Sequence, residues 1–400
     1  MKILVSNAGS TSLKFKLFDM ENERALCDSR VERVGSAGAA AFQYENLVTG
    51  KKIAREGLCV REYTDGINLF LSAVAGEELG AVGDIREVEA VGFKTVIARG
   101  FYGTHELTDE VMAALHDGAR IAPAHNIPYI EAINVFKKLL PGAKMVGAFE
   151  TEFHQTVPVG RQIYPVPYEW YEKYGIRRYG YHGASHGWIA EAIAKLTGGR
   201  ARKVISCHLG GSGSLCAIED GKSVDSTCGF SLQSGIPHAS RAGDIDPYTF
   251  PYLLGEGLTE AEILAGMAKR GGLLGVSGTS GDMRDLEAAA DSGDACAKLA
   301  IDMYVHAIVK SIGALYAVLG GLDALVFTGG IGENSARVRS EVCARVRHLG
   351  IWLDAEKNAS RGAARMIALE DSPVEAWVIP ANEELNVARR AMKLLRGQRG

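Results

Sequence analysis

The sequence has few cysteines, little net charge and no run of basic residues, and each of these scarcities excludes a class of protein. Its seven cysteines show no paired metal-binding spacing, so we expect free thiols in a reducing, cytoplasmic setting rather than a zinc module or a disulfide-stapled secreted domain. The formal net charge of −4 gives no support for a nucleic-acid surface. Asn7 interrupts the apolar N-terminus early, so we also expect no secretory leader.

Long unbroken apolar runs are missing as well. The longest apolar stretch, residues 312–327, is interrupted by Gly320, Gly321 and Asp323, which predicts a core helix, a turn and a strand instead of a membrane span. A chain of 400 residues exceeds what one hydrophobic core usually holds, so we expect two domains. We place them at residues 1–149, completed by a C-terminal helix over 385–400, and at residues 150–384.

Apolar periodicity gives a coarse secondary structure. It predicts helices over residues 111–119, 130–140, 186–196, 296–319 and 384–395. Residues 158–170 carry three prolines and several aromatic residues, which predicts a loop or the edge of a lid.

A polar turn stands near the N-terminus. A short apolar strand, residues 3–5, leads into the small polar residues 7–12, and a second strand, residues 13–18, follows at once. Glycine and small hydroxyl residues allow a tight turn whose N–H groups and hydroxyls suit an anion, most often a phosphate. An ordinary polar hairpin explains the turn about equally well.

A second hairpin with a turn of small residues occurs about 200 residues later in the sequence. Residues 204–208 form a strand, residues 209–214 turn it back, and return strands follow. Asn7 aligns with His208, and Gly9 aligns with Gly210. Hairpins that alternate with helices in both halves predict a duplicated α/β domain with a site between the halves.

Two glycine-rich segments are candidates for holding a nucleotide. In residues 327–335 a buried strand ends in a glycine-rich turn, and we expect a helix to begin at Asn334 or Ser335, where free N–H groups favour a phosphate. In residues 275–284, Asp282 suits ribose hydroxyls and Arg284 suits stacking on a base, although helix capping explains Asp282 equally well. Residues 221–223 resemble the end of a P-loop, but the required earlier glycine is Cys216 and the context is a hairpin turn.

Three polar clusters complete the pattern. His182 and His186 flank small residues just before a helix; a histidine can stabilise a transferring phosphoryl group, and His186 fits a structural role at the helix start. Arg241 precedes two aspartates, which fits either a local salt bridge or an anion clamp. Glu383 and Glu384 open a helix, which fits either helix-dipole capping or a carboxylate that faces Mg²⁺.

Together these motifs resemble the acetate kinase family, part of the superfamily of acetate kinases, sugar kinases, heat-shock chaperones and actin. The resemblance extends from residue 7 to residue 384 and rests on residues 7–14, 178–183, 243–247, 327–335 and 382–384. It implies two duplicated ribonuclease H-like (actin-like ATPase) domains with a cleft between them, usually in a homodimer. It also implies reversible in-line phosphoryl transfer from ATP to a short-chain carboxylate of the acetate or propionate type, with Mg²⁺ or Mn²⁺, giving ADP and an acyl phosphate.

The resemblance also implies roles for individual residues. The catalytic set carried over by position is Asn7, Glu150, His182 and Arg241. The acid would contact Lys94, Ala124, Tyr181 and Leu232, and the metal would contact Asn7 and Glu383. The nucleotide would be held by Ser10, Ser12, Lys14, His208, Gly210, Gly211, Ser212, Gly213, Asp282, Met283, Arg284, Gly330, Ile331, Gly332 and Asn334.

Departures from the family pattern gather on the acid side. Lys94 replaces an arginine and loses its bidentate fork, and Glu150 replaces an aspartate and is one methylene longer. Ala124, Tyr181 and Leu232 replace a leucine, a phenylalanine and a proline. We therefore hypothesise that acetate is not the best substrate. Two alternatives stay open: a different phosphoryl donor such as pyrophosphate, and a nucleotide-binding paralogue with little turnover that acts as a sensor or interaction module.

Overall fold

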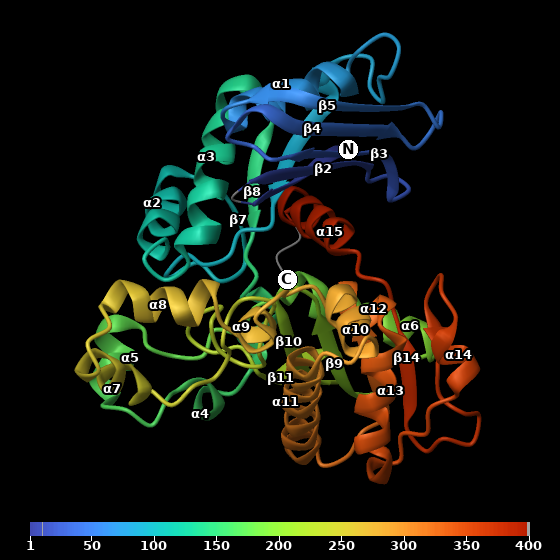
Figure 1. Ribbon diagram of the computed structural model, residues 1–400. Coiled ribbons are helices and arrows are strands. Elements are labelled where there is room, and N and C mark those ends of the chain that lie inside the picture. The colour runs from blue at the N-terminus through green and yellow to red at the C-terminus, as the bar shows by residue number, and fades with distance from the viewer. Residues whose placement is uncertain (10, 398–400) are drawn as a thin grey trace. The chain divides into compact units, whose positions relative to one another are not determined.

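Figure 1 shows a computed structural model of the chain, which describes every residue except Ser10 and residues 398–400, and every side chain within the described part except that of Ala124. The chain divides into two compact units. The first is Met1–Glu152 with Asn382–Gly400, and the second is Phe153–Ala381. The boundary that we expect from the sequence, after Phe149, falls close to this division.

The first unit is built on one eight-stranded sheet in the order β5-β4-β3-β2-β1-β6-β8-β7. Its strands are β1 (Lys2–Gly9), β2 (Ser12–Asp19), β3 (Arg24–Glu32), β4 (Ser36–Asn46), β5 (Lys52–Val60), β6 (Val88–Phe93), β7 (Thr104–Glu106) and β8 (Lys144–Ala148). Its helices are α1 (Tyr63–Val74), the 3-10 helix η1 (Ile85–Glu87), α2 (Asp109–Gly118), α3 (Pro123–Leu139) and α15 (Glu383–Leu395). Strands β1, β6 and β8 run parallel, so their carboxyl ends meet at one edge.

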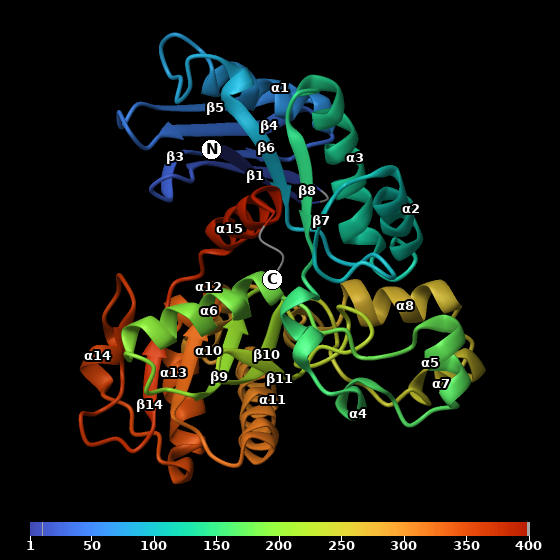
Figure 2. The same cartoon turned by 180° about the vertical axis from the view of Figure 1, so that it is seen from behind.

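Helices cover both faces of this sheet (Figures 1 and 2). On one face Phe15 stacks on Phe70 of α1, and Phe93 contacts Phe136 of α3. On the other face a side chain at Gly92 would meet the Val387 methyl of α15 at 3.0 Å, so α15 packs close to the backbone. Because side chains alternate along a strand, Asn7 points to the α15 face of β1.

The second unit is built on a six-stranded sheet in the order β11-β10-β9-β12-β14-β13. Its strands are β9 (Lys203–Leu209), β10 (Gly213–Glu219), β11 (Lys222–Ser226), β12 (Ala324–Thr328), β13 (Arg365–Met366) and β14 (Glu375–Val378). Its helices are α4 (Val159–Gln162), α5 (Tyr168–Tyr174), α6 (Gly183–Leu196), α7 (Thr249–Gly255), α8 (Glu260–Lys269), α9 (Gly272–Ser277), α10 (Met283–Asp291), α11 (Ala295–Leu319), α12 (Gly329–Asn334), α13 (Ala336–Arg345), η3 (Arg347–Leu349) and α14 (Ala355–Ala359). The 3-10 helix η2 (Glu152–Thr156) spans the division between the units.

The two sheets share one topology. In each, three antiparallel strands are followed by two parallel ones: β3-β2-β1-β6-β8 in the first and β11-β10-β9-β12-β14 in the second. The register agrees as well, because Ser6 pairs with Phe93 as Cys207 pairs with Phe327. Asn7 and His208 are therefore equivalent positions, and the duplicated α/β fold predicted from the sequence is confirmed.

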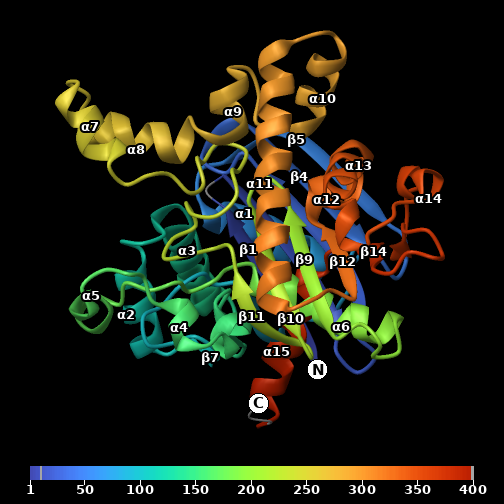
Figure 3. The same cartoon turned by 90° about the horizontal axis from the view of Figure 1, so that it is seen from below.

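Helix α11 is long and apolar enough to cross a membrane by composition alone. In the structure it lies along one face of the second sheet, and α6 lies on the opposite face (Figures 2 and 3). Ile301, Val305 and Ile308 of α11 are fully buried in the core beneath β12. Gly320 ends the helix in the left-handed region at φ 63°, and β12 follows. The expectation of a core helix, a turn and a strand is thus confirmed.

Three local predictions were wrong in detail. Residues 158–170 do not form only a loop, because they contain α4 and the start of α5. The glycine-rich residues 329–334 form the short helix α12 where we expect a turn; the helix expected after them is confirmed as α13, because Ser335 caps it by accepting from the Val338 N–H. Helix α6 begins at Gly183, three residues before the predicted start, with His182 at its N-cap in a left-handed conformation.

Candidate active site

The carboxyl ends of β1 and β6 hold two of the predicted residues of the first unit against α15. The Asn7 side-chain Nδ2 donates to Glu384 Oε1 at 3.0 Å, and Lys94 Nζ donates to Glu383 Oε2. Both glutamates lie in the first turn of α15, where negative charge is favoured by the helix dipole. The open end of parallel strands is where α/β sheets usually bind ligands.

Lys94 is the positive charge of this group. Burial by itself lowers the pKa of the Lys94 ammonium, but the carboxylates of Glu383 and Glu150 outweigh burial and hold that pKa well above its usual value. Glu150 is only 4% exposed, and its N–H donates to the Thr95 carbonyl at 2.9 Å, which ties the segment after β8 to the segment after β6. Lys94 is therefore a permanent cation between carboxylates.

Tyr129 of α3 also reaches this group, and sequence reasoning missed it. Its hydroxyl donates to Asn7 Oδ1 at 3.4 Å, and burial raises its pKa, so the hydroxyl stays protonated. An aromatic residue at helical spacing is indistinguishable from a core residue in the sequence.

The remaining predicted residues of the first unit are less informative. Lys14 pairs with Asn7 across the β1–β2 ladder but is exposed, and Ser12 pairs with Gly9. Ser10 lies outside the described residues. Ala124 belongs to α3 by its backbone, and its side chain is not described.

In the second unit, His182 and His208 lie face to face. Their rings stack with centroids 4.4 Å apart and an angle of 23° between their planes. His182 Nδ1 is 2.8 Å from Ser214 Oγ, and His208 Nδ1 is 2.8 Å from Ser185 Oγ. Each imidazole is thus oriented by a serine hydroxyl.

The predicted phosphate turn, residues 210–213, is anchored by a histidine that follows it in the sequence. The Gly213 N–H donates to His238 Nδ1 at 3.0 Å. Burial, assisted by the nearby Arg241 charge, lowers the pKa of His238 to about 3, so its ring is neutral and can accept this bond. Ser212 Oγ is buried and has no hydrogen-bond partner among the described residues, which leaves a hydroxyl for a ligand.

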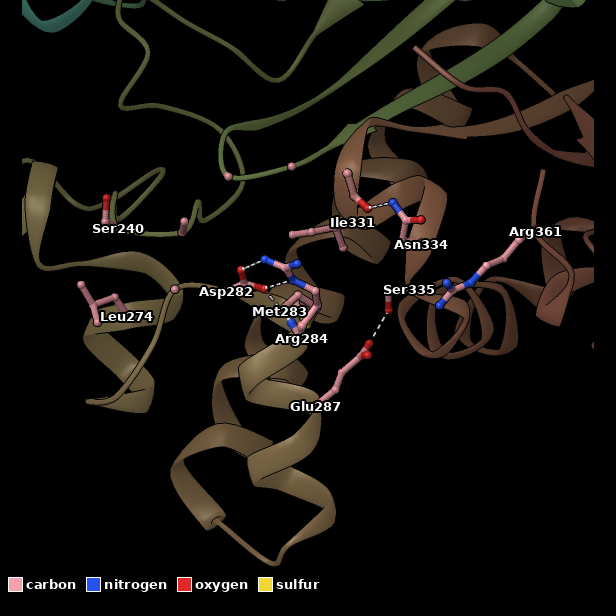
Figure 4. A pocket seen from close by; sticks show the side chains of 15 residues that line it. Ser240, Leu274, Asp282, Met283, Arg284, Glu287, Ile331, Asn334, Ser335 and Arg361 are labelled. Carbon is pink, nitrogen blue, oxygen red and sulfur yellow. Dashed lines mark hydrogen bonds and ion pairs between the residues drawn. The ribbon is translucent and has the colours of Figure 1, made fainter. Parts of the chain in front are cut away.

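A pocket of about 870 Å³ opens beside this turn (Figure 4). Eight predicted nucleotide residues line it: Gly210, Gly211, Asp282, Met283, Arg284, Gly330, Ile331 and Asn334. Seven other residues complete the lining: Ala239, Ser240, Leu274, Gly281, Glu287, Ser335 and Arg361. The predicted residues His208, Ser212, Gly213 and Gly332 do not line it. The volume is within the range of roughly 300–1,000 Å³ that is usual for small-molecule sites.

Polar side chains in the pocket bond to one another. Asp282 caps α10 by accepting from the Arg284 N–H at 2.9 Å, and its carboxylate pairs with the Arg284 guanidinium at 2.5 Å. The hydrogen bond from Arg284 lowers the pKa of Asp282 to about 2. The capping interpretation of Asp282 is therefore realised, and the Arg284 fork is held in place at the pocket wall.

Arg339 stabilises the glycine-rich helix α12 by binding its last carbonyl groups. This arginine is 1% exposed; its guanidinium donates to the carbonyls of Gly332 and Glu333, each at 2.9 Å, and to Asn358 Oδ1 at 2.7 Å. Gly329 begins α12 at φ 78°, where a Cβ would lie 2.7 Å from the Leu209 carbonyl. Only glycine fits this approach of α12 to β9.

Arg241 behaves as a cation without an anion. Its guanidinium makes no hydrogen bond or ion pair with the residues that the structure describes, and burial lowers its pKa. Asp244 and Asp246 accept instead from the backbone N–H groups of Gly235 and Tyr248. The salt-bridge interpretation is thus wrong, and an anion clamp fits the arrangement.

Tyr181 and Leu232, predicted to contact the acid, are both buried. The Tyr181 hydroxyl donates to the Phe230 carbonyl at 2.7 Å, and burial raises its pKa well above the usual value. Since its hydroxyl is bonded to the main chain, Tyr181 presents mainly its apolar ring to other neighbours.

The chain is similar to acetate kinases and to a propionate kinase. The acetokinase family matches residues 2–389. The acetate kinase of Clostridium botulinum strain Hall is 44% identical over 393 residues, 97% of this chain and 98% of that protein, and the acetate kinase of Carboxydothermus hydrogenoformans is 42% identical over 399 residues, 99% of each. Among solved structures, Porphyromonas gingivalis acetate kinase has a TM-score of 0.88 and 36% identity, covering 98% of this chain and 99% of that one. A propionate kinase from Francisella tularensis has a TM-score of 0.90 and 32% identity, covering 97% and 98%.

Proposed function

Because the chain belongs to the acetokinase family, we propose that it reversibly transfers the γ-phosphoryl group of ATP to the carboxylate of a short-chain acid. The products are ADP and an acyl phosphate. The observation that carries the proposal is the partly buried, anion-free Arg241 guanidinium, close enough to His238 to lower its pKa, while His238 anchors the phosphate turn. The relatives are named as kinases, and nothing in them favours a paralogue with little turnover.

The chemistry needs charge and position rather than a base. A carboxylate oxygen attacks the γ-phosphorus while the bond from that phosphorus to the β,γ-bridging oxygen breaks, and no proton is transferred. Preorganised hydrogen-bond donors and cations supply most of the stabilisation of the transition state. We assign Arg241 and Lys94 as cations, Asn7 and His182 as hydrogen-bond donors, and Glu150 as the carboxylate that holds Lys94.

We assign the pocket of Figure 4 to the nucleoside of ATP and residues 210–213 to its phosphates. A divalent ion, Mg²⁺ or Mn²⁺, would neutralise those phosphates. Among the described residues no group of three or more His, Cys, Asp or Glu side chains is arranged to hold a metal. The carboxylates of Glu383 and Glu384 and the Asn7 amide oxygen fit a hard cation that keeps waters and phosphate oxygens as its other ligands.

We propose that propionate or butyrate is a better substrate than acetate. Ala124 is three carbons smaller than the leucine of the family pattern, and the ring of Tyr181 and the side chain of Leu232 are apolar. One methylene in an apolar pocket changes specificity by roughly 10–200-fold. With MgATP, a panel of acids and hydroxylamine to trap the acyl phosphate, we expect kcat/KM for the longer acids to exceed that for acetate about tenfold.

The same panel separates the alternatives. Acetate turnover equal to or above that of the longer acids contradicts the proposed preference. In Ala124→Leu, whose side chain restores the family's leucine, we expect the preference to move toward acetate. Absence of product with every acid, while calorimetry shows ADP binding, would establish the non-catalytic alternative. Turnover with pyrophosphate but not with ATP would identify a different donor.

We further propose that the protein is a homodimer of the cytoplasm, where its seven free thiols stay reduced. One candidate interface is a series of exposed apolar side chains around α7 and α8, which we call the α7–α8 surface: Ile245, Tyr248, Tyr252, Leu254, Leu258 and Leu264. Tyr248 is 80% exposed and Tyr252 66%. Contiguous apolar surface is rare on monomers, and tyrosine is enriched at interfaces.

Light scattering tests this surface. We expect the double variant Tyr248→Asp, Tyr252→Asp to have the mass of a monomer where the unmodified protein has that of a dimer, because two charges would be desolvated on association. Leu299→Asp is the matched control: Leu299 is 59% exposed on α11, outside the α7–α8 surface, and this variant should remain a dimer. A dimeric double variant would exclude the surface.

A further inference from the structure

A line of hydrogen bonds runs from Ser206 through His186 and Ser214 to His182. Ser206 Oγ is 2.9 Å from His186 Nδ1, Ser214 Oγ is 2.8 Å from His186 Nε2, and the same oxygen is 2.8 Å from His182 Nδ1. All four residues are at most 8% exposed. The line therefore lies inside the second unit, between α6 and its sheet.

The spacing of these residues along α6, β9 and β10 places all four side chains on facing surfaces. His182 and His186 are four residues apart, so both face the sheet from the start of α6. Ser206 lies on β9, two residues before His208, and Ser214 on β10 pairs directly with His208, so both serines face α6. Farther along the same helix, Ile189 and Ile193 pack on the sheet as an apolar core. The hydrogen-bonded residues therefore occupy one end of the contact between α6 and the sheet. This end lies near the carboxyl end of β9.

His186 carries one proton at a time. Burial, and next the neighbouring His154 and His208, lower its pKa well below the usual value, so its ring is neutral. A neutral imidazole donates from one nitrogen and accepts at the other, and a serine hydroxyl has one proton to donate. When His186 donates to Ser214, the single Ser214 proton can go either to His182 Nδ1 or to the nearby Cys228 sulfur. Burial raises the pKa of the Cys228 thiol to about 12, so it stays protonated, and a thiol sulfur is a much weaker acceptor than a neutral imidazole nitrogen. Two directions of the line are therefore favoured.

In the first direction, Ser206 donates to His186, His186 Nε2–H donates to Ser214, and Ser214 donates to His182 Nδ1. His182 then carries its proton on Nε2, the nitrogen on the far side of the ring from Ser214, where it can donate to a phosphoryl oxygen. In the second direction every bond is reversed, and a neutral His182 would turn a lone pair, instead of a donor, away from Ser214. A lone pair repels the negative charge of a transferring phosphoryl group.

We propose that His186 is a positioning residue that fixes His182 as its Nε2–H tautomer by setting the direction of this line. This role rests on the proposed function of His182 as a donor to the transferring group. It also explains why a buried histidine occupies a helix start where an apolar residue would pack more simply: His186 supplies both a donor and an acceptor in one rigid ring. Hydrogen-bond partners that orient a metal-ligating histidine typically change activity by about 10–100-fold, and we expect an effect of similar size for His186.

The first test is spectroscopic and uses the unmodified protein. With ¹⁵N-labelled histidine and bound MgADP at pH 8, we expect ring nitrogen shifts that assign the proton to Nε2 of both His182 and His186. A neutral His182 that carries its proton on Nδ1 overturns the proposal. Since this measurement needs no turnover, it is independent of whether any acid is phosphorylated.

Two variants supply the second test. The Nε2 amide of His186→Gln can still donate to Ser214, whereas the shorter His186→Asn reaches only toward Ser206. We expect His186→Asn to lower kcat about 10–100-fold with an ADP Kd within twofold of the original and a mixed His182 tautomer. His186→Gln should remain within about fivefold. Unchanged kcat in His186→Asn, or equal loss in both variants while both bind ADP, would overturn the positioning role.

Discussion

Replacing Arg241 by alanine should abolish phosphoryl transfer while leaving ADP affinity nearly intact. The guanidinium is partly buried and has no anionic partner among the described residues, so its charge is available for the carboxylate or for the transferring group. An arginine that stabilises the transition state of phosphoryl transfer contributes roughly 10³–10⁵-fold to kcat. We therefore expect kcat to fall at least about a thousandfold in the hydroxamate assay, with the calorimetric Kd for ADP within threefold.

The melting temperature of the variants shows whether Arg241 serves catalysis or the stability of the fold. A partly buried cation without a partner costs free energy in the folded state, so Arg241→Ala should melt at the same temperature as the original protein or higher. Arg241→Lys is the matched control: it keeps the charge but loses the planar fork, and we expect partial activity. Full activity in the alanine variant would remove Arg241 from the site, and a large fall in melting temperature would show that it serves the fold.

Replacing Lys94 by methionine should damage both activity and stability. Methionine has nearly the same volume but leaves the carboxylates of Glu383 and Glu150 without their cation. Removal of one partner from such a group typically costs about 3–5 kcal/mol, and we expect the free energy of unfolding to fall by about 3 kcal/mol at pH 7.5. The variant should also lose more than about a hundredfold in kcat, since positioned charge supplies much of the catalysis.

The loss of stability expected in Lys94→Met depends on pH. In the original protein the folded-state pKa of Lys94 is raised above the ordinary 10.5, so its contribution to stability is complete below about pH 10.5 and disappears only as pH rises through the raised pKa. In Lys94→Met the stranded carboxylates should acquire raised pKa values, and their penalty should shrink as pH falls toward 5. Denaturant titrations at pH 5 and pH 7.5 measure the difference. Lys94→Arg is the control, and equal losses at both pH values would contradict the account.

Much of the site could be predicted because its local signals are strong. Small residues at 210–213 and 329–334 have few structural alternatives, and residues of both segments line the same pocket. The strand predicted after Gly320 and Gly321 is β12, Ala324–Thr328, since a buried apolar run between glycines leaves little choice.

The rest depends on contacts between distant segments. Arg361 lies 74 residues after Glu287 and lines the same pocket, and nothing near Arg361 in the sequence indicates a ligand. The bond between His186 and Ser214 requires the register of β10 against β9, which spacing alone does not give. The start of α12 at Gly329 was missed because glycine is a poor helix former, and here a close approach to β9 overrides that propensity.

The matching registers of the two sheets have an evolutionary consequence. Asn7 and His208 occupy equivalent positions, and so do Lys94 and Thr328, each the residue that follows the phenylalanine of the equivalent pair. Two copies of one gene segment begin with the same residues at such positions, but here the residues differ. The first unit has an amide and a lysine, and the second has an imidazole and a hydroxyl that precedes a glycine backbone. The side chains at equivalent positions of the two units are therefore no longer interchangeable.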